Sequence, residues 1–245
     1  MPCAKYCHFD KQLRFFCQFC SMKYAIITGA SSGFGAATAQ ELQKMGYGLV
    51  LLARRVDRLE TLQKTLTTTP VYIAALDVCS QTHVQAVIAA LPKEIAANIF
   101  ILVNNAGLAV GRGPLDTGLS EDWNRMIDTN VKGLLYVSQA VIPLLKKHPN
   151  SHLINISSIA GKEVYAGGNV YCASKHAVDA LSKALRIDLL AHEIKVSNIA
   201  PGAAETEFSL VRFKGDARTA QSVYEGFAAL QAADIAQTVA FIVSR

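Results

Sequence analysis

The sequence predicts an α/β fold, in which a doubly wound parallel sheet carries helices on both faces. From residue 23 onward, short apolar runs alternate with segments of helical periodicity, and most of these runs are apolar throughout. Strands of that kind are buried on both faces, and their alternation with helices builds parallel βαβ units. Because no Pro/Ser/Gly-rich linker interrupts the 245 residues, we expect one domain over residues 22–245.

The elements follow in order along the chain. Strands are expected at residues 24–28, 48–53, 71–76, 99–103, 152–156 and 195–199. Helices are expected at residues 36–44, 56–66, 81–91, 121–147, 171–192 and 234–244, with residues 121–147 helical in two or more stretches. The helix at 56–66 shows the spacing most clearly, because apolar residues at 56, 59, 62 and 66 fall on one face. We expect Pro143 to bend the fourth helix.

The chain stops within the last expected helix, at Arg245. A Rossmann-like sheet would add a final strand after that helix, and that strand is apparently missing. We therefore expect the sequence to be a fragment that keeps its binding crevice but exposes an unpaired strand edge.

Composition excludes several classes of protein. Hydrophobic residues make up 51% and charged residues 18% of the chain, which is incompatible with intrinsic disorder. The net charge of +5 is spread without long like-charge runs, so no nucleic-acid partner is expected. No apolar stretch approaches the ~18 residues of a membrane span, and no secretory signal is present. We expect a cytoplasmic protein without a membrane partner.

Cysteines gather at the start of the chain, where Cys3, Cys7, Cys17 and Cys20 lie within residues 1–21. The Cys17-x-x-Cys20 spacing would suit zinc, but nothing after Cys20 completes a site. The favoured interpretation is a dispensable N-terminal extension outside the core, with Met22 as the true start, and no metal.

A glycine-rich loop joins the first strand to the first helix, in the pattern Gly29-x-x-x-Gly33-x-Gly35. Gly29 permits a sharp turn, Gly33 lets backbone approach a pyrophosphate, and Gly35 lets the helix pack against the sheet. The free N–H groups of the helix would bind the phosphates. A tight turn alone is the alternative, but the position between strand and helix favours dinucleotide binding, with Ser31, Ser32 and Phe34 also in the loop.

The second strand ends in Arg54-Arg55, with no acidic residue to bind a ribose 2′-hydroxyl. Guanidinium groups suit a phosphate, so the sequence favours NADP over NAD. The alternative is that both arginines are the solvated start of the next helix.

Tyr171 and Lys175 lie one helical turn apart, and Ser158 follows the fifth strand. At the carboxyl edge of the sheet these groups suit hydride transfer, in which a phenol exchanges a proton with an alcohol or carbonyl oxygen. We expect the Lys175 ammonium to lower the pKa of Tyr171. The Tyr-x-x-x-Lys pattern alone would be unremarkable on a surface helix.

Taken together, these motifs resemble the short-chain dehydrogenases/reductases over residues 22–245. The resemblance also rests on Asn104-Asn105-Ala106-Gly107 after the fourth strand, Asn130 in DTNVKG, and Pro201-Gly202 after the sixth. It implies a catalytic tetrad of Asn130, Ser158, Tyr171 and Lys175, with Asn130 holding a proton-relay water and Lys175 also binding the ribose. It implies further cofactor contacts at Asp77, Val78, Asn104, Ala106, Gly107, Tyr171, Pro201, Gly202 and Thr206.

Segments such as NNAGLAVGRGP and TEFSLVRFKGD are similar to the NADP-dependent 3-hydroxy acid (serine or L-allo-threonine) dehydrogenases. This implies oxidation of a short 3-hydroxy acid such as serine, L-allo-threonine or 3-hydroxyisobutyrate, and a homo-oligomer, in this family a tetramer. The alternatives are an NADPH-dependent carbonyl reductase of a bulkier substrate and an idle NADP-binding regulatory protein. Arg212 is our candidate for binding the substrate carboxylate, beside Ser158 on the substrate oxygen; Arg112 and Lys214 are its rivals.

Overall fold

The computed structural model describes residues 22–245 of the chain. The N-terminal extension predicted for residues 1–21, with its four cysteines and the zinc alternative, lies outside the described residues. None of the described helices is both long and apolar enough to cross a membrane.

Six parallel strands form the central sheet, in the order β3-β2-β1-β4-β5-β6. They are β1 (Tyr24–Thr28), β2 (Gly48–Ala53), β3 (Val71–Ala75), β4 (Ile99–Asn104), β5 (His152–Ile156) and β6 (Lys195–Ile199). Every residue of β1, β2 and β5 is buried, as the apolar runs predict. β3 and β6 are only partly buried because they are the edge strands. The strand order reverses between β1 and β4, which is where open sheets of this class bind ligands.

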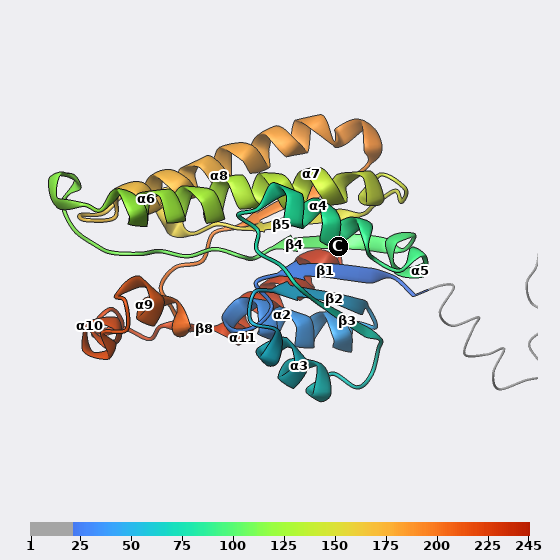
Figure 1. The fold of residues 1–245 in the computed structure, drawn as a ribbon, viewed down its shortest axis with the longest axis horizontal. Helices are drawn as coiled ribbons and strands as arrows, with labels where there is room; N and C mark the ends of the chain where they lie inside the picture. The colour runs from blue at the N-terminus through green and yellow to red at the C-terminus, as the bar shows by residue number, and fades with distance from the viewer. Residues whose placement is uncertain (1–21) are drawn as a thin grey trace, which may run out of the picture.

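Helices cover both faces of the sheet, so the predicted doubly wound fold is confirmed (Figure 1). One face carries α4 (Gln81–Ala89), α5 (Lys93–Ala96), α7 (Leu134–Leu145) and α8 (Asn169–Asp188); the other carries α2 (Gly33–Lys44), α3 (Val56–Thr65) and α11 (Ala232–Val243). Each face has its own apolar core. Ile26, Leu102 and Val141 belong to the first, and Ile27, Leu42 and Val239 to the second.

The helical segment predicted at 121–147 is divided into more than one stretch, as expected, but the division lies away from Pro143. It consists of α6 (Ser120–Ile127), a π-helical turn over Asp128–Gly133, and α7, which continues through Pro143. A π turn is a frequent feature of functional sites, and this one carries Asn130 with its amide turned towards the chain at Leu108. The interruption thus falls where Asn130 bonds to Leu108, 22 positions away in the sequence, and not at the proline.

The segment between β6 and α11 holds small elements that the sequence analysis did not predict. They are β7 (Ala204–Glu205), α9 (Glu207–Arg212), α10 (Ala217–Ser222) and β8 (Leu230–Gln231). We call residues 204–231 the cap segment. β7 pairs in parallel with β8, and this pairing brings the two ends of the cap segment together. The Tyr224 hydroxyl reinforces the segment by bonding to Ser209 and to the Ala204 carbonyl.

The burial of His152 in β5 predicts how the stability of the protein depends on pH. Its burial, aided by the charge of Lys195, lowers the pKa of the imidazole from near 6.5 to about 4. Between these values the unfolded chain binds a proton that the folded protein excludes, so stability falls as pH falls through this window. We expect His152→Gln to remove up to about 3 kcal/mol of the acid-induced loss. Denaturant unfolding of both proteins near neutral pH and near pH about 5 measures the difference; equal losses in both would contradict it.

Candidate active site

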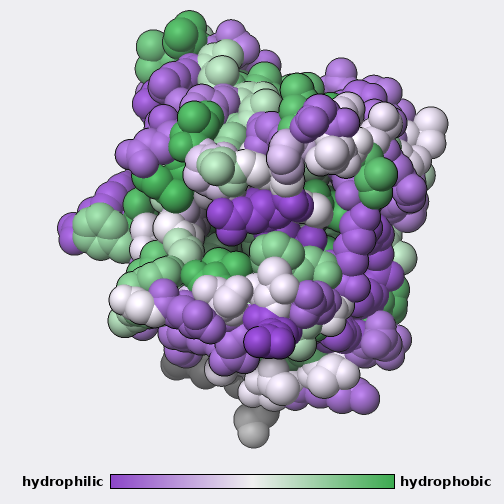
Figure 2. Space-filling model, turned by 90° about the vertical axis from the view of Figure 1, so that its left-hand side faces the viewer, coloured by the Kyte–Doolittle hydropathy of each residue, from purple (hydrophilic) through white to green (hydrophobic). Residues whose placement is uncertain are grey.

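A cleft of about 550 Å³ opens at the carboxyl ends of the strands. Its lining comes from the loops after all six strands of the sheet, from α8, and from α9 of the cap segment. Figure 2 shows this face of the molecule, hollowed near its centre, with apolar side chains bordering the hollow and hydrophilic atoms lying across it. Nearly all the residues that the sequence analysis singled out meet here.

The glycine-rich loop has the backbone geometry that the sequence predicts. Gly29 and Gly33 have φ of 65° and 52°, in the left-handed region that favours glycine. A Cβ on Gly35 would lie 2.5 Å from the Gly29 carbonyl oxygen, so this glycine permits the close packing of α2. No side chain caps the first turn of α2. Its free N–H groups therefore face the cleft as an anion-binding site.

Arg54 and Arg55 follow β2 and line the cleft beside this loop. The Arg55 guanidinium donates to the Ser32 hydroxyl at 2.8 Å and to the Ser31 hydroxyl at 3.3 Å. The two serines and the arginines thus form one cluster of donors at the edge of the cleft. No acidic residue follows β2 at this point, as the sequence analysis noted.

Of the other residues predicted to contact the cofactor, most line the cleft, but the side chain of Asn104 does not. Asp77, Val78, Ala106 and Gly107 line the cleft. The Asn104 side chain lies elsewhere, within the sheet, where it donates to Ser138 and Asn155 and is 4% exposed. Pro201, Gly202 and Thr206 line the opposite side.

Asn105 lines the cleft, whereas Asn104 does not. The prediction named Asn104 as a cofactor contact and gave Asn105 only as part of the motif. The Asn105 amide Nδ2 donates to the carbonyl oxygens of Thr28 and Gly29 at 2.8 and 3.1 Å. The side chain therefore ties the loop after β4 to the loop after β1. In an all-parallel sheet alternate residues point to opposite faces, and that alternation was the available signal for choosing between Asn104 and Asn105.

Ser158, Tyr171 and Lys175 converge in the cleft, as predicted. Ser158 begins the turn after β5, and Tyr171 and Lys175 lie on successive turns of α8. The Lys175 ammonium donates to the Ile156 carbonyl at 2.9 Å, and its burial lowers its pKa to about 8. A lysine with such a pKa can exchange protons near neutrality.

Tyr171 has the opposite shift from the one expected from the sequence. Burial raises the pKa of its phenol to about 12, and the groups that act against this are the Ser158 hydroxyl and the Arg212 guanidinium. The prediction that Lys175 lowers this pKa is therefore wrong for this structure, because desolvation outweighs the charges nearby. The phenol is protonated at neutral pH.

Asn130 lies behind the wall of the cleft and is 2% exposed. Its Oδ1 accepts from the Leu108 amide, and its Nδ2 donates to the Leu108 carbonyl, both at 2.8 Å, and to Ser174 at 3.0 Å. Asn130 thus fixes the chain at Leu108, which forms part of the cleft. Only Gly107 separates it from the Lys175 ammonium, because a Cβ there would meet both side chains.

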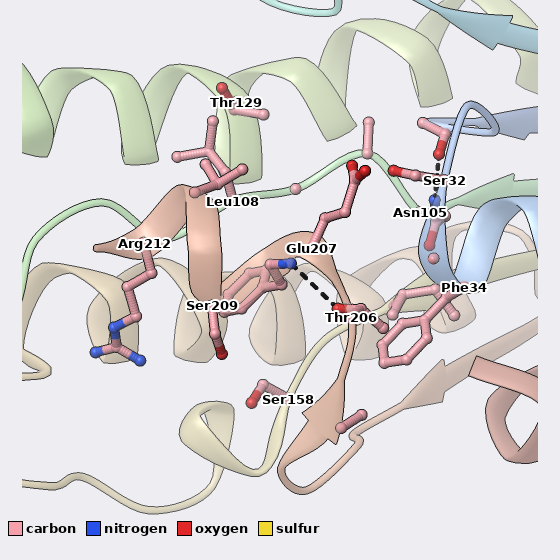
Figure 3. Close-up of a pocket in the computed structure, with 18 of the residues that line it drawn as sticks. Ser32, Phe34, Asn105, Leu108, Thr129, Ser158, Thr206, Glu207, Ser209 and Arg212 are labelled. Carbon is pink, nitrogen blue, oxygen red and sulfur yellow. Dashed lines mark hydrogen bonds between the residues drawn. The ribbon is translucent and has the colours of Figure 1, made fainter. Parts of the chain in front are cut away.

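Arg212, at the end of α9, extends over the rings of Tyr165 and Tyr171, with 5.4 Å from its guanidinium carbon to each ring centre. Its Nε and Nη2 are buried and have no hydrogen-bond partner. A buried donor without an acceptor is costly, so this guanidinium is suited to an anion entering the cleft. Figure 3 shows Arg212 and Glu207 projecting from opposite ends of α9.

The two rivals of Arg212 differ from it. Lys214 is engaged with Asp122 at 2.9 Å. Arg112 is exposed and lies 5.8 Å from the Tyr165 ring. Sequence reasoning identified the arginine but missed its aromatic neighbour Tyr165, because only the fold brings the loop that carries Tyr165 to α9. The described residues contain no group of three or more His, Cys, Asp or Glu placed to hold a metal ion.

Comparisons with known proteins agree with this geometry. Residues 23–216 match the sequence model of the family described as short chain dehydrogenase. The chain is 43% identical over 215 residues to NADP-dependent 3-hydroxy acid dehydrogenase of Escherichia coli, covering 87% of this chain and 86% of that protein. It is 44% identical over 218 residues to sulfoacetaldehyde reductase of Chromohalobacter salexigens, covering 88% and 86%. Its structure resembles the closed form of serine dehydrogenase complexed with NADP+, with TM-score 0.87, 42% identity, and coverage of 91% and 89%.

Proposed function

This chain belongs to the short chain dehydrogenases, and from that membership and the cleft we propose an NADP-dependent oxidoreductase of short 3-hydroxy acids. Serine, L-allo-threonine and 3-hydroxyisobutyrate represent the substrate class. The observation that carries the substrate assignment is the pair of buried donors Nε and Nη2 of Arg212, which have no hydrogen-bond partner and lie beside Tyr171.

The residues present fit NADP. The uncapped start of α2 and the left-handed Gly29 and Gly33 suit the pyrophosphate. Arg54 and Arg55 suit a 2′-phosphate, with Asp77 and Val78 towards the adenine and Lys175 towards the nicotinamide ribose. Bound there, the nicotinamide would supply the hydride acceptor for oxidation of the substrate, or the hydride donor for the reverse reaction.

The chain's own residues then move the proton. Ser158 holds the substrate oxygen beside Tyr171. In the reduction direction the Tyr171 phenol donates its proton to that oxygen. In the oxidation direction the phenol first passes its proton to Lys175 in its neutral form, and the resulting phenolate accepts the proton of the substrate hydroxyl. Because burial lowers the pKa of Lys175 to about 8, this side chain can exchange protons with the phenol near neutrality. Asn130, next to Lys175 across Gly107, is proposed to support the relay to solvent.

Arg212 is proposed to set the length and charge of the substrate. Its guanidinium lies 5.4 Å from the ring of the phenol that exchanges the proton. In a 3-hydroxy acid a single carbon separates the carboxylate from the carbon that bears the hydroxyl, so such a molecule can reach both groups. A bidentate carboxylate would satisfy the free Nε and Nη2. A bulkier carbonyl substrate does not account for these free donors.

The remaining features of the proposal extend the sequence resemblance. They are one catalytic domain at residues 22–245 with residues 1–21 outside it, a homo-oligomeric state, and a cytoplasmic location. Sizing chromatography of the purified chain tests the oligomer, and fractionation of the source cells tests the location.

The relative affinity for NADPH and NADH tests the role of Arg54 and Arg55 after β2. We expect replacement of Arg54 and Arg55 by alanine to weaken NADPH binding by about 10- to 150-fold for each charge-assisted hydrogen bond lost. NADH binding should change little, because it lacks the 2′-phosphate. Titration of cofactor fluorescence measures both affinities. Lys64→Ala is a matched control, since Lys64 is an exposed cation on α3, the helix that follows the two arginines, and makes no ion pair among the described residues. Equal losses for both cofactors would refute the role of the arginines.

A further inference from the structure

Glu207, the first residue of α9, joins the cap segment to the arginines after β2. Its Oε2 accepts from Arg55 at 3.1 Å, and its Oε1 accepts from Arg58 at 2.5 Å. Glu207 lies 152 positions from Arg55 and 149 positions from Arg58 in the sequence. In Figure 3 the Glu207 carboxylate points from α9 towards the loop that carries Ser32.

The same arginine serves both the glycine-rich loop and this carboxylate. Arg55 donates through Nε and Nη2 to the hydroxyls of Ser31 and Ser32, and through Nη1 to Glu207. Two guanidiniums and two hydroxyls form a donor set that suits an anion with several oxygens, such as a phosphate. In this structure the anion bound to that set is the chain's own carboxylate.

We propose that Glu207 is a specificity-determining residue that competes with the cofactor 2′-phosphate for Arg55, and so narrows the preference for NADP(H) over NAD(H). This inference rests on the proposed function, in which Arg55 binds that phosphate. NADPH must take Arg55 from Glu207 when it binds. NADH has a ribose 2′-hydroxyl at the same position and leaves the ion pair intact.

Arg58 explains how the exchange leaves the cap segment in place. It lies one helical turn after Arg55, on α3, and contacts the other carboxylate oxygen of Glu207. When a phosphate takes Arg55, Glu207 keeps its bond to Arg58, and α9 stays attached to α3. Arg212, at the other end of α9, thereby keeps its position over Tyr171.

The size of the effect follows from the exposure of the pair. The side chains of Arg55 and Glu207 are 42% and 43% exposed, and ion pairs of that kind are weak because water and salt screen them. We therefore expect removal of the competing carboxylate to tighten NADPH binding by no more than about fivefold. A simple surface ion pair that only holds the cap segment would instead affect both cofactors alike.

The experiment compares Glu207→Gln with Glu205→Gln. Both remove one negative charge from the cap segment at nearly the same place, but Glu205 is exposed and makes no ion pair with the described residues. Dissociation constants for NADPH and NADH are measured for the wild type and both variants by fluorescence titration at low salt. The ratio of the two constants removes any general effect on folding or on the cap segment.

We expect the preference for NADPH to rise in Glu207→Gln, by up to about fivefold, and to stay at the wild-type value in Glu205→Gln, with NADH binding unchanged. An unchanged ratio in Glu207→Gln, or an equal rise in both variants, would overturn the proposal while the cofactor assignment stands. A wild type without any preference for NADPH would overturn the cofactor assignment and this proposal with it.

Discussion

Tyr171→Phe is expected to lower kcat by about 10²- to 10⁴-fold, the range typical for loss of a general acid or base. The phenol ring is 8% exposed and packs 5.7 Å from Phe208, so phenylalanine fills the same space. The variant loses only the hydroxyl that exchanges the proton. NADPH affinity and the melting temperature should change little, because the ring and its packing remain.

Steady-state turnover with a short 3-hydroxy acid, together with NADPH titration, measures this prediction. Tyr165→Phe is the matched control, since Tyr165 also lines the cleft and stacks with Arg212 but has no assigned proton transfer. Near-normal turnover in Tyr171→Phe, or an equal loss in both variants, would contradict the mechanism.

Arg212→Gln is expected to lower kcat/KM for a 3-hydroxy acid by about 10- to 150-fold, the equivalent of one charge-assisted hydrogen bond or more. We expect kcat/KM to fall mainly for the free acid, because its carboxylate would bind Nε and Nη2 of Arg212, which have no hydrogen-bond partner. The methyl ester of the same acid lacks the charge and should lose much less. Comparing kcat/KM for acid and ester in wild type and variant isolates the contribution of the charge.

Arg112→Gln serves as the control for this effect, because Arg112 lines the same cleft, is exposed, and lies 5.8 Å from the same Tyr165 ring. We expect Arg112→Gln to lower kcat/KM only slightly, and by the same factor for the acid and for the ester. If kcat/KM for the free acid, relative to the ester, falls further in Arg112→Gln than in Arg212→Gln, then Arg112 and not Arg212 binds the carboxylate.

The strands and the cofactor loop could be predicted from the sequence because their signals are local. β1 and β2 are continuous apolar runs, and their observed bounds equal the predicted ones. Gly29 and Gly33 stand where the turn needs left-handed backbone, so residue type alone marks the position. Tyr171 and Lys175 share a helix, and their spacing places them on one side of it.

Features that depend on distant contacts were beyond the sequence. The direction of the pKa shift of Tyr171 depends on how deeply the cleft buries the phenol, and neither residue spacing nor charge count conveys burial. The link from Glu207 to Arg55 and Arg58 joins the cap segment to α3, and nothing in either segment alone indicates it. Arg212 was proposed for its residue type, but its free donors are visible only in the assembled cleft.

The most direct test of the central claim is kcat/KM of the wild-type chain with NADP+ for a short 3-hydroxy acid and for its methyl ester. NADPH formation is followed for both substrates under the same conditions. If Arg212 binds the carboxylate while Tyr171 exchanges the proton, the free acid should exceed the ester by about tenfold or more. An ester turned over as well as the acid, or a protein that binds NADPH and oxidises neither, would contradict the account.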